Sequence, residues 1–417
     1  MKVLFFTYYW PPSGKASLHL PLKIIKYFPD FEIEPIVVTV KNDGFSRRDE
    51  SLLREVSPSL PVFKTKVLEP FGIYKKFLGK KDDDELVPSD TISKENKSLR
   101  HRISVWIRMN LFIPDARVGW YPFAVKKGKE LIKQFNPDAI ITLGPPHSTH
   151  LIGLRLSKKF RLPHIPLFID PWVDIVYYAG FKRNFITLAF DNYLEKQVLL
   201  NSRKVMFVTE TMKSDYLKKF PALDSKSHIL YWGYSEDEFS GFASTSPPEE
   251  TIVHAGNIFD YQNPPNLWKE IKKLNDNNRK INLKFIGTVS PLIRKEIEDN
   301  GLGNVTSYLG FLPYKQMLAE LHRASYLLVC ASEKRHLPGK LFEYLRVGKP
   351  VLAFGDDNKE VEQILLKANA GMIFGYNDDV SPFFSATDRF HTNYEVIKNF
   401  DRKQSTAFFS QLLKEIR

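Results

Sequence analysis

The feature of this sequence that most constrains its fold is an alternation of short apolar runs with longer amphipathic runs, which occurs twice. In the first half, residues 3–9 and 33–40 are typical of buried strands, and the stretch between them has helical spacing. A segment rich in Ser, Pro and Glu at 240–250 interrupts the pattern, which restarts at 252–255. Strands that alternate with helices form parallel sheets, so the sequence predicts an α/β protein with two doubly wound, Rossmann-like domains.

Length and composition limit the classes of protein to consider. The 417 residues suffice for two domains with separate cores, and a hydrophobic content of 43% is that of a folded protein. No apolar run approaches the roughly 20 residues that span a bilayer, and the apolar start before Pro11 is shorter than a signal-peptide core, so we expect a cytoplasmic protein. A single cysteine, Cys330, excludes a disulfide framework and a cysteine metal cluster. No His, Asp or Glu spacing indicates a metal cage, and we expect neither a metal nor a cofactor.

The charge balance favours anionic partners. Lys and Arg number 60 against 48 Asp and Glu, which gives a net charge of +12. The segment 94–112 carries Arg100, Arg102 and Arg108 among apolar residues, a pattern typical of a helix on an anionic membrane surface. The same helix could instead pack its apolar side against the first domain, and the sequence leaves both possibilities open.

Three loops in the first half carry candidate site residues. His147 lies in a breaker loop after a predicted strand, and Asp170 directly follows the next predicted strand. Because parallel strands end at a common sheet edge, where α/β proteins bind ligands, both side chains are candidates for function. Each could equally cap a turn or a helix. Gly14, in the loop after the first strand, is a similar candidate, with a plain strand-to-helix turn as its alternative.

The stretch 338–354 is the strongest local signal in the second half. A turn at Gly339 precedes residues with the spacing of one helical face, and a buried strand follows. The N-terminus of a helix binds phosphate readily, and Lys340 would supply a countercharge there. Glu343, one turn further along, could accept hydrogen bonds from sugar or ribose hydroxyls. A solvated surface pair without function is the alternative for these two side chains.

Three segments taken together resemble the retaining glycosyltransferases of the GT-B fold, in particular glycosyltransferase family 4. They are residues 11–14, residues 144–153 with 170–172, and residues 338–351. The resemblance implies an acceptor-side domain at 1–238, a nucleotide-sugar domain at 239–399, and a final helix within 400–417 that packs back on the first domain. It also implies transfer of a hexosyl group from a nucleoside-diphosphate sugar to a glycan or lipid-linked acceptor with retention, in cell-surface polysaccharide synthesis.

The resemblance further assigns binding residues. Nucleotide-sugar binding is implied for residues of both halves: Gly14, Gly256, Asn257, Phe311, Gly339, Lys340, Leu341 and Glu343. Within this set, Lys340 and the loop at Gly339 would meet the diphosphate, whereas Glu343 would contact the ribose. Phe311, which follows a glycine, would lie near the base.

The resemblance implies catalytic roles for His147 and Asp170. His147 matches the family's histidine that contacts the donor sugar near the reacting carbon, and Asp170 is a candidate for contact with the acceptor. The chain departs from the family in two places. The first of two family glutamates would stand at position 335, where this chain has Arg335, and the Arg and Lys that many members carry after the first glycine of the second domain are absent from 256–262.

Two other functions are compatible with these patterns. A GT-B sugar-nucleotide epimerase would convert the same kind of donor without any acceptor. A non-catalytic protein would use the basic surface to bind RNA or anionic lipid, whereas for a transferase we expect no nucleic-acid partner and at most a peripheral membrane contact.

Overall fold

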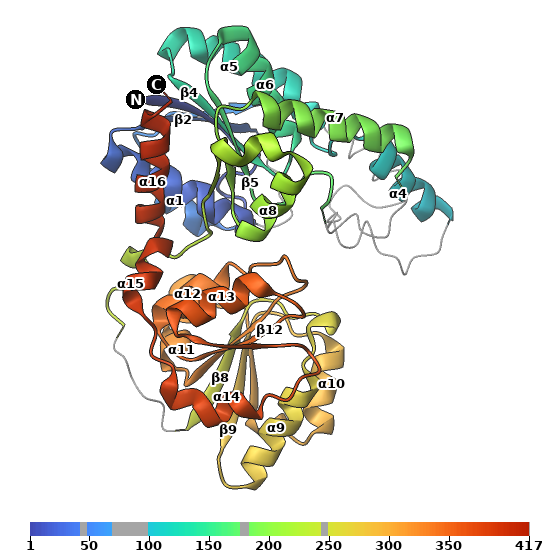
Figure 1. The fold of residues 1–417 in the computed structure, drawn as a ribbon, viewed down its shortest axis with the longest axis vertical. Coiled ribbons are helices and arrows are strands. Elements are labelled where there is room, and N and C mark those ends of the chain that lie inside the picture. The colour runs from blue at the N-terminus through green and yellow to red at the C-terminus, as the bar shows by residue number, and fades with distance from the viewer. Residues whose placement is uncertain (42–47, 69–98, 176–182, 243–248, 417) are drawn as a thin grey trace. The chain divides into compact units, whose positions relative to one another are not determined.

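The computed structural model describes residues 1–41, 48–68, 99–175, 183–242 and 249–416. The chain forms two compact units, Met1–Tyr231 with Thr406–Arg417, and Trp232–Ser405. Each unit contains one parallel sheet with helices packed on it (Figure 1). The predicted fold class, two Rossmann-like domains, is therefore confirmed. Residues 232–238, expected in the first domain, lie within the second unit.

The first unit is built on seven parallel strands in the order β3-β2-β1-β4-β5-β6-β7. The strands are β1 (Lys2–Phe6), β2 (Glu34–Val40), β3 (Val62–Thr65), β4 (Ala139–Gly144), β5 (His164–Phe168), β6 (Val205–Phe207) and β7 (Ser227–Ile229). The helices of this unit are α1 (His19–Tyr27), α4 (Leu99–Leu111), α5 (Tyr121–Phe135), α6 (Ser148–Phe160), α7 (Phe185–Asn201) and α8 (Glu210–Lys219). Strand order reverses between β1 and β4, whose apolar side chains form one core with residues of α5 and α6.

The second unit repeats this design with six parallel strands in the order β10-β9-β8-β11-β12-β13. The strands are β8 (Glu250–Ala255), β9 (Ile281–Ile286), β10 (Thr306–Gly310), β11 (Tyr326–Cys330), β12 (Val351–Phe354) and β13 (Gly371–Phe374). The helices are α9 (Pro265–Asp276), α10 (Pro291–Asp299), α11 (Tyr314–Arg323), α12 (Lys340–Val347), α13 (Lys359–Ala368), α14 (Ser381–Ala386) and α15 (Tyr394–Ile397). Here the strand order reverses between β8 and β11.

The last helix, α16 (Arg402–Lys414), begins in the second unit and continues into the first. In the first unit, the ring of Phe409 packs against that of Phe28, and Lys414 pairs with Glu32 at 2.8 Å. At its start, the N–H of Arg402 donates to the carbonyl of Tyr234 at 2.7 Å. This pairing joins the last helix to the segment after Tyr231 and explains why that segment belongs to the second unit.

The helices differ in whether the preceding side chain caps their first turn. Asn184 and Asn358 cap α7 and α13, since each side chain accepts a backbone N–H of the first turn. By contrast, α6 and α12 begin without a side-chain cap from the residue that precedes them. Both helices follow a strand beside the reversal of strand order, so their first turns lie at the ligand-binding edge of each sheet.

Two observations concern the membrane. Of the helices that the structure describes, none is long and apolar enough to cross a bilayer. The basic segment expected at 94–112 contains α4, while its residues 94–98 fall outside the described ranges.

Candidate active site

Lys340 is the central residue of the second unit's sheet edge. It is the first residue of α12, and its ammonium lies 3.4 Å from Nε2 of His254 on β8. Nδ1 of His254 donates to the carbonyl of Leu328 at 2.9 Å, which leaves Nε2 as the acceptor for the lysine. Burial, together with the nearby lysine, holds the pKa of His254 well below its usual value, so the imidazole is neutral.

The charge of Lys340 is poorly compensated within the protein. Among the residues that the structure describes, its ammonium forms no ion pair with a carboxylate. Burial is the main cause that lowers its pKa to about 8, and the neighbouring Cys330 and Glu343 oppose that shift. Because a cation held away from water without a close counterion is costly, the site is suited to an anionic ligand.

The backbone around Lys340 adds to this positive potential. Gly339 precedes α12 with helical backbone angles and offers no side chain to its first-turn N–H groups. The helix dipole therefore points its positive end at the same edge as the lysine. The N–H of Leu341 bonds to the carbonyl of Pro338 at 3.0 Å, and the Leu341 side chain is fully buried. Leu341 thus supports the helix from the core, and its side chain is not available to a nucleotide.

The Lys340 ammonium fits at the end of β8 because Gly256 has no side chain there. Its φ of +107° is a conformation that favours glycine, and a Cβ at this position would lie 2.7 Å from the Lys340 ammonium. Gly339 differs, because a Cβ there would make ordinary contacts with Trp232 at 3.7 Å. Asn257 is exposed, and its side-chain oxygen accepts the N–H of Thr288 at 3.3 Å.

Of the residues expected near the nucleoside, Glu343 is hydrogen-bonded within the protein and Phe311 is exposed. One carboxylate oxygen of Glu343 already accepts a hydrogen bond from the hydroxyl of Tyr314 at 2.8 Å. Burial raises the pKa of Glu343, and the nearby charge of Arg402 opposes that rise. Phe311 follows β10, and its side chain is 72% exposed. At the position where the family glutamate was expected, Arg335 pairs with Glu333 at 3.4 Å.

At the first unit's sheet edge, His147 precedes α6 and is buried. Its ring stacks on Trp172 with an interplanar angle of 9°, and its Nε2 lies 3.2 Å from the carbonyl of Pro171. A carbonyl only accepts, so Nε2 carries the proton and Nδ1 is left as an acceptor. Burial lowers the pKa of His147 to about 3. The neutral ring is fixed against the loop after β5, and Gly14 lies in the loop after β1 on the other side of the strand reversal.

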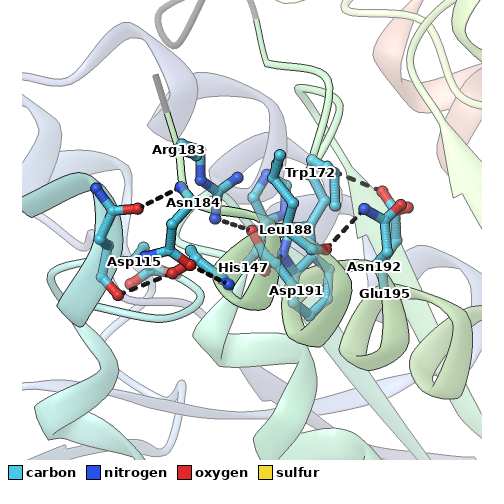
Figure 2. Close-up of polar contacts among 12 residues, drawn as sticks. Asp115, His147, Trp172, Arg183, Asn184, Leu188, Asp191, Asn192 and Glu195 are labelled. Atoms are coloured by element: carbon cyan, nitrogen blue, oxygen red, sulfur yellow. Dashed lines mark hydrogen bonds and ion pairs between the residues drawn. The ribbon is translucent and has the colours of Figure 1, made fainter. Parts of the chain in front are cut away.

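The N-terminus of α6 already holds a carboxylate of the protein itself. Asp115 accepts the N–H of Ser148 at 2.7 Å through Oδ2 and the hydroxyl of Ser148 at 2.9 Å through Oδ1. Burial raises the pKa of Asp115, while both hydrogen bonds oppose that rise. Figure 2 shows Asp115 beside His147. The positive end of this helix is therefore occupied, unlike that of α12.

The loop after β5 is anchored to α7 by buried carboxylates. Nε1 of Trp172 donates to Asp191 at 2.6 Å, and the N–H of Val173 donates to Glu195 at 3.3 Å. Arg183 and Lys219 neutralise these two acids at 2.5 Å and 2.6 Å respectively. Figure 2 shows Asp191 and Glu195 on successive turns of α7, on the side that faces Trp172.

Asp170 opens the same loop. Burial raises its pKa to about 6, and the charge of Lys15, next to Gly14, opposes the shift. The loops that carry Gly14, His147 and Asp170 all leave the carboxyl ends of the first unit's strands, as predicted from their positions after strands.

Across the described ranges, no group of three or more His, Cys, Asp or Glu side chains is arranged to hold a metal ion.

Known proteins share this fold and part of this sequence. Residues 236–401 match the model of the family "Glycosyl transferases group 1". The matched residues span almost the whole of the second unit. The match includes Gly256, Phe311 and the whole of α12, and it supports glycosyl transfer as the activity. No curated protein sequence matches the chain.

Three solved structures of low sequence identity share the GT-B fold with this chain. Sucrose-phosphate synthase from Thermosynechococcus elongatus has a TM-score of 0.65 and 11% identity, covering 99% of this chain and 98% of its own. Anabaena HepE, solved with UDP and glucose, has a TM-score of 0.61 and 13% identity over 100% of both chains. The lipopolysaccharide outer core galactosyltransferase WaaB has a TM-score of 0.61 and 12% identity, also over 100% of both.

Several residues that shape the two sheet edges were missed by sequence reasoning. In the second unit these are His254 and Tyr314, and in the first unit they are Asp115, Asp191 and Glu195. His254 could have been found, because it is a polar residue in an otherwise apolar strand two residues before Gly256. Asp115 gave no signal, since the helix it caps begins far along the chain at Ser148.

Proposed function

We propose that this chain is a family 4-like enzyme that transfers a hexosyl group from a nucleoside-diphosphate sugar to a glycan or lipid-linked acceptor, with retention at the anomeric carbon. The biological role that we assign is cell-surface polysaccharide synthesis. The observation that carries the proposal is Lys340 at the N-terminus of α12, whose ammonium is desolvated by burial and forms no ion pair with a carboxylate among the described residues. The match to the group 1 family supports glycosyl transfer, and the UDP and glucose with which HepE was solved support a nucleotide-sugar donor.

The second unit would stabilise the leaving group. As the bond between the anomeric carbon and the diphosphate oxygen breaks, its electron pair goes to the diphosphate, whose negative charge grows. Lys340 and the N-terminus of α12 provide positive charge that is fixed before the reaction starts. Gly256 has no Cβ to crowd the ammonium, which leaves room for the diphosphate to approach it.

The first unit would hold the acceptor. The new bond between the anomeric carbon and the acceptor oxygen forms on the face of the sugar that the diphosphate leaves. The proton of the reacting acceptor hydroxyl passes to the departing diphosphate, which conserves charge. Asp170 accepts a hydrogen bond from a neighbouring, non-reacting hydroxyl of the acceptor, for which it must be ionised. Since its pKa is raised to about 6, most of it is ionised at pH 7.

His147 has a positioning role in this proposal. A neutral imidazole with a pKa of about 3 cannot donate a second proton at pH 7. Its stacking on Trp172 and its hydrogen bond to Pro171 fix the loop that begins at Asp170. In the family, the matching histidine contacts the donor sugar; in this chain we expect His147 to act on the sugar through that loop.

A panel of nucleotide sugars tests the proposal. Each is added to the purified chain, and the shift in melting temperature is measured, because a true donor stabilises the folded state by mass action. The donor that gives the largest shift is then incubated with and without candidate acceptors, and the anomeric configuration of the product is read by NMR. We expect acceptor-dependent release of the nucleoside diphosphate and a product with the donor's configuration.

Other results would reject parts of the proposal. Conversion of the nucleotide sugar without an acceptor would identify an epimerase. Inversion at the anomeric carbon would leave glycosyl transfer but remove retention. If no nucleotide sugar shifts the melting temperature, Lys340 does not bind a diphosphate donor.

A further inference from the structure

An exposed apolar surface lies on two helices of the first unit. Its residues come from two helices, α4 and α7: Ile103, Trp106, Leu111, Phe185, Ile186, Phe190 and Tyr193. We call this the α4–α7 surface. Phe185 is 80% exposed and Trp106 is 51% exposed. Side chains of this size are usually buried, and several together on a soluble protein mark an interaction site.

The two helices are joined as one structural element. The side-chain oxygen of Asn110, in α4, accepts the N–H of Asn184 at 2.7 Å, and the carbonyl of Asn110 accepts the hydroxyl of Thr187 at 3.1 Å. Figure 1 shows the last turns of α4 beside the first turns of α7. Along α7, the exposed apolar residues recur on one face, and the rings of Phe190 and Tyr193 stack on that face with 6.5 Å between centroids.

The sequence of α4 is basic, and the exposed charge of α7 is also positive. The sequence of α4 contains no acidic residue and carries Arg100, Arg102 and Arg108. Both acids of α7, Asp191 and Glu195, are buried on the opposite side, where Trp172 and Val173 bind them. The exposed charge of α7 is that of Lys196.

We propose that the α4–α7 surface docks on an anionic lipid bilayer. Apolar and aromatic side chains enter the headgroup region, and the surrounding basic residues contact lipid phosphates. Trp and Tyr, which are both present, favour the boundary between headgroups and acyl chains. A second copy of the chain would place the basic residues of two α4 helices in one contact, which like-charge repulsion disfavours. This docking does not depend on the proposed glycosyl transfer, but it would bring the first unit to a lipid-linked acceptor.

Flotation with lipid vesicles tests this inference on the full chain. The probes are vesicles of phosphatidylcholine alone and of phosphatidylcholine with about one third phosphatidylglycerol, at low and high salt. We expect binding to the anionic vesicles, at least tenfold weaker binding to the neutral ones, and weakening by salt. The double variant Phe185→Ser/Phe190→Ser should bind anionic vesicles at least tenfold more weakly. Leu366→Ser is the matched control, since Leu366 is 77% exposed on α13 of the second unit, and it should bind like the wild type.

The fluorescence of Trp106 supplies a second readout on the wild-type protein. Four of the six tryptophans are buried, Trp232 is half-buried, and Trp106 is the exposed one. Brominated lipids in anionic vesicles should quench fluorescence of the wild type, and this quenching should be lost in Trp106→Phe.

Three results would overturn the inference. They are wild-type protein that does not float with anionic vesicles, a double variant that folds and floats like the wild type, and quenching that persists in Trp106→Phe. A wild-type dimer that becomes monomeric in the double variant, without vesicle binding, would assign the surface to a second copy instead. The nucleotide-sugar melting shift of the double variant separates this test from that of glycosyl transfer, because docking can fail while that shift is retained.

Discussion

The N-termini of α6 and α12 occupy equivalent places in their units, but the charged group beside them differs. It is a carboxylate at α6 and an ammonium at α12. Each helix follows a strand beside the reversal of strand order and begins without a side-chain cap from the preceding residue. At α6 the carboxylate of Asp115 takes the first-turn N–H and hydroxyl of Ser148. At α12 the first-turn N–H groups of Leu341 and Phe342 bond to the carbonyls of Pro338 and Gly339, and the side chain of Lys340 adds a positive charge. The same fold therefore places a carboxylate at one helix N-terminus and an ammonium at the other, and we propose that only the second binds an anion.

The largest expected effect follows from removing the charge at α12. Lys340→Ala should lower kcat/KM by a factor of about 100 to 1,000, or roughly 3–4 kcal/mol, because a fixed positive charge stabilises the leaving diphosphate in the transition state. Lys359→Ala is the matched control: Lys359 is also the first residue of its helix, but Asn358 caps that helix and the lysine is exposed. Steady-state kinetics with the donor from the panel measures both variants. Equal activity of Lys340→Ala and the wild type would contradict the role of Lys340.

A second prediction concerns the space around that charge. Gly256→Ala should raise the donor KM by about tenfold or more, because the new Cβ would lie 2.7 Å from the Lys340 ammonium and the φ of +107° disfavours alanine. Gly339→Ala, with helical backbone angles and ordinary contacts at 3.7 Å, should stay within about threefold of the wild type. If both alanine variants change the donor KM equally, donor binding does not require the missing Cβ of Gly256 beside Lys340.

The pH dependence of donor binding sharpens the comparison further. The pKa of Lys340 is lowered to about 8, so the ammonium loses its proton as the pH rises through 8. Donor affinity should therefore be full below pH 7 and fall by up to tenfold per pH unit above 8. Lys340→Arg, which stays charged, should abolish this fall even if its affinity is lower. Calorimetric titration from pH 6 to 9.5 measures the profile, and a flat wild-type profile would show that the charge of Lys340 does not matter.

The smallest expected effect is at the N-terminus of α6. Asp115→Ala should reduce the free energy of unfolding by about 1–2 kcal/mol, because the N–H of Ser148 loses a buried partner. Donor affinity should stay within about twofold. Asp49→Ala is the control, since Asp49 makes the same kind of contact to Ser51 at an exposed site and its loss should cost less. Urea unfolding measures both, and a large loss of donor affinity in Asp115→Ala would place the diphosphate in the wrong unit.

Sequence reasoning found the parts of this arrangement that depend on local pattern. Alternation of apolar and amphipathic runs predicted the two parallel sheets, because each strand and helix signals itself over a few residues. Lys340 and Gly256 were identified because a turn or a glycine stands next to a strand or a helix at each position. The resemblance to a known family supplied their roles.

The rest depends on contacts between residues far apart in the chain. Nothing near Glu343 indicates that Tyr314 will donate to it, and nothing near Ser148 points to Asp115. Leu341 was expected to bind the nucleotide sugar, but helix periodicity alone does not say which side of α12 faces the sheet, and the structure buries it. His147 was expected to face the donor sugar; its stacking on Trp172 depends on the anchoring of a distant loop by α7.

The most direct test of this account is calorimetry of nucleoside-diphosphate binding to the wild type, Lys340→Ala and Asp115→Ala. The nucleoside diphosphate is the one whose sugar gives the largest melting shift. We predict at least 30-fold weaker binding to Lys340→Ala and unchanged binding to Asp115→Ala. Unchanged binding to Lys340→Ala, or a matching loss in Asp115→Ala, would contradict the assignment of the anion site to α12.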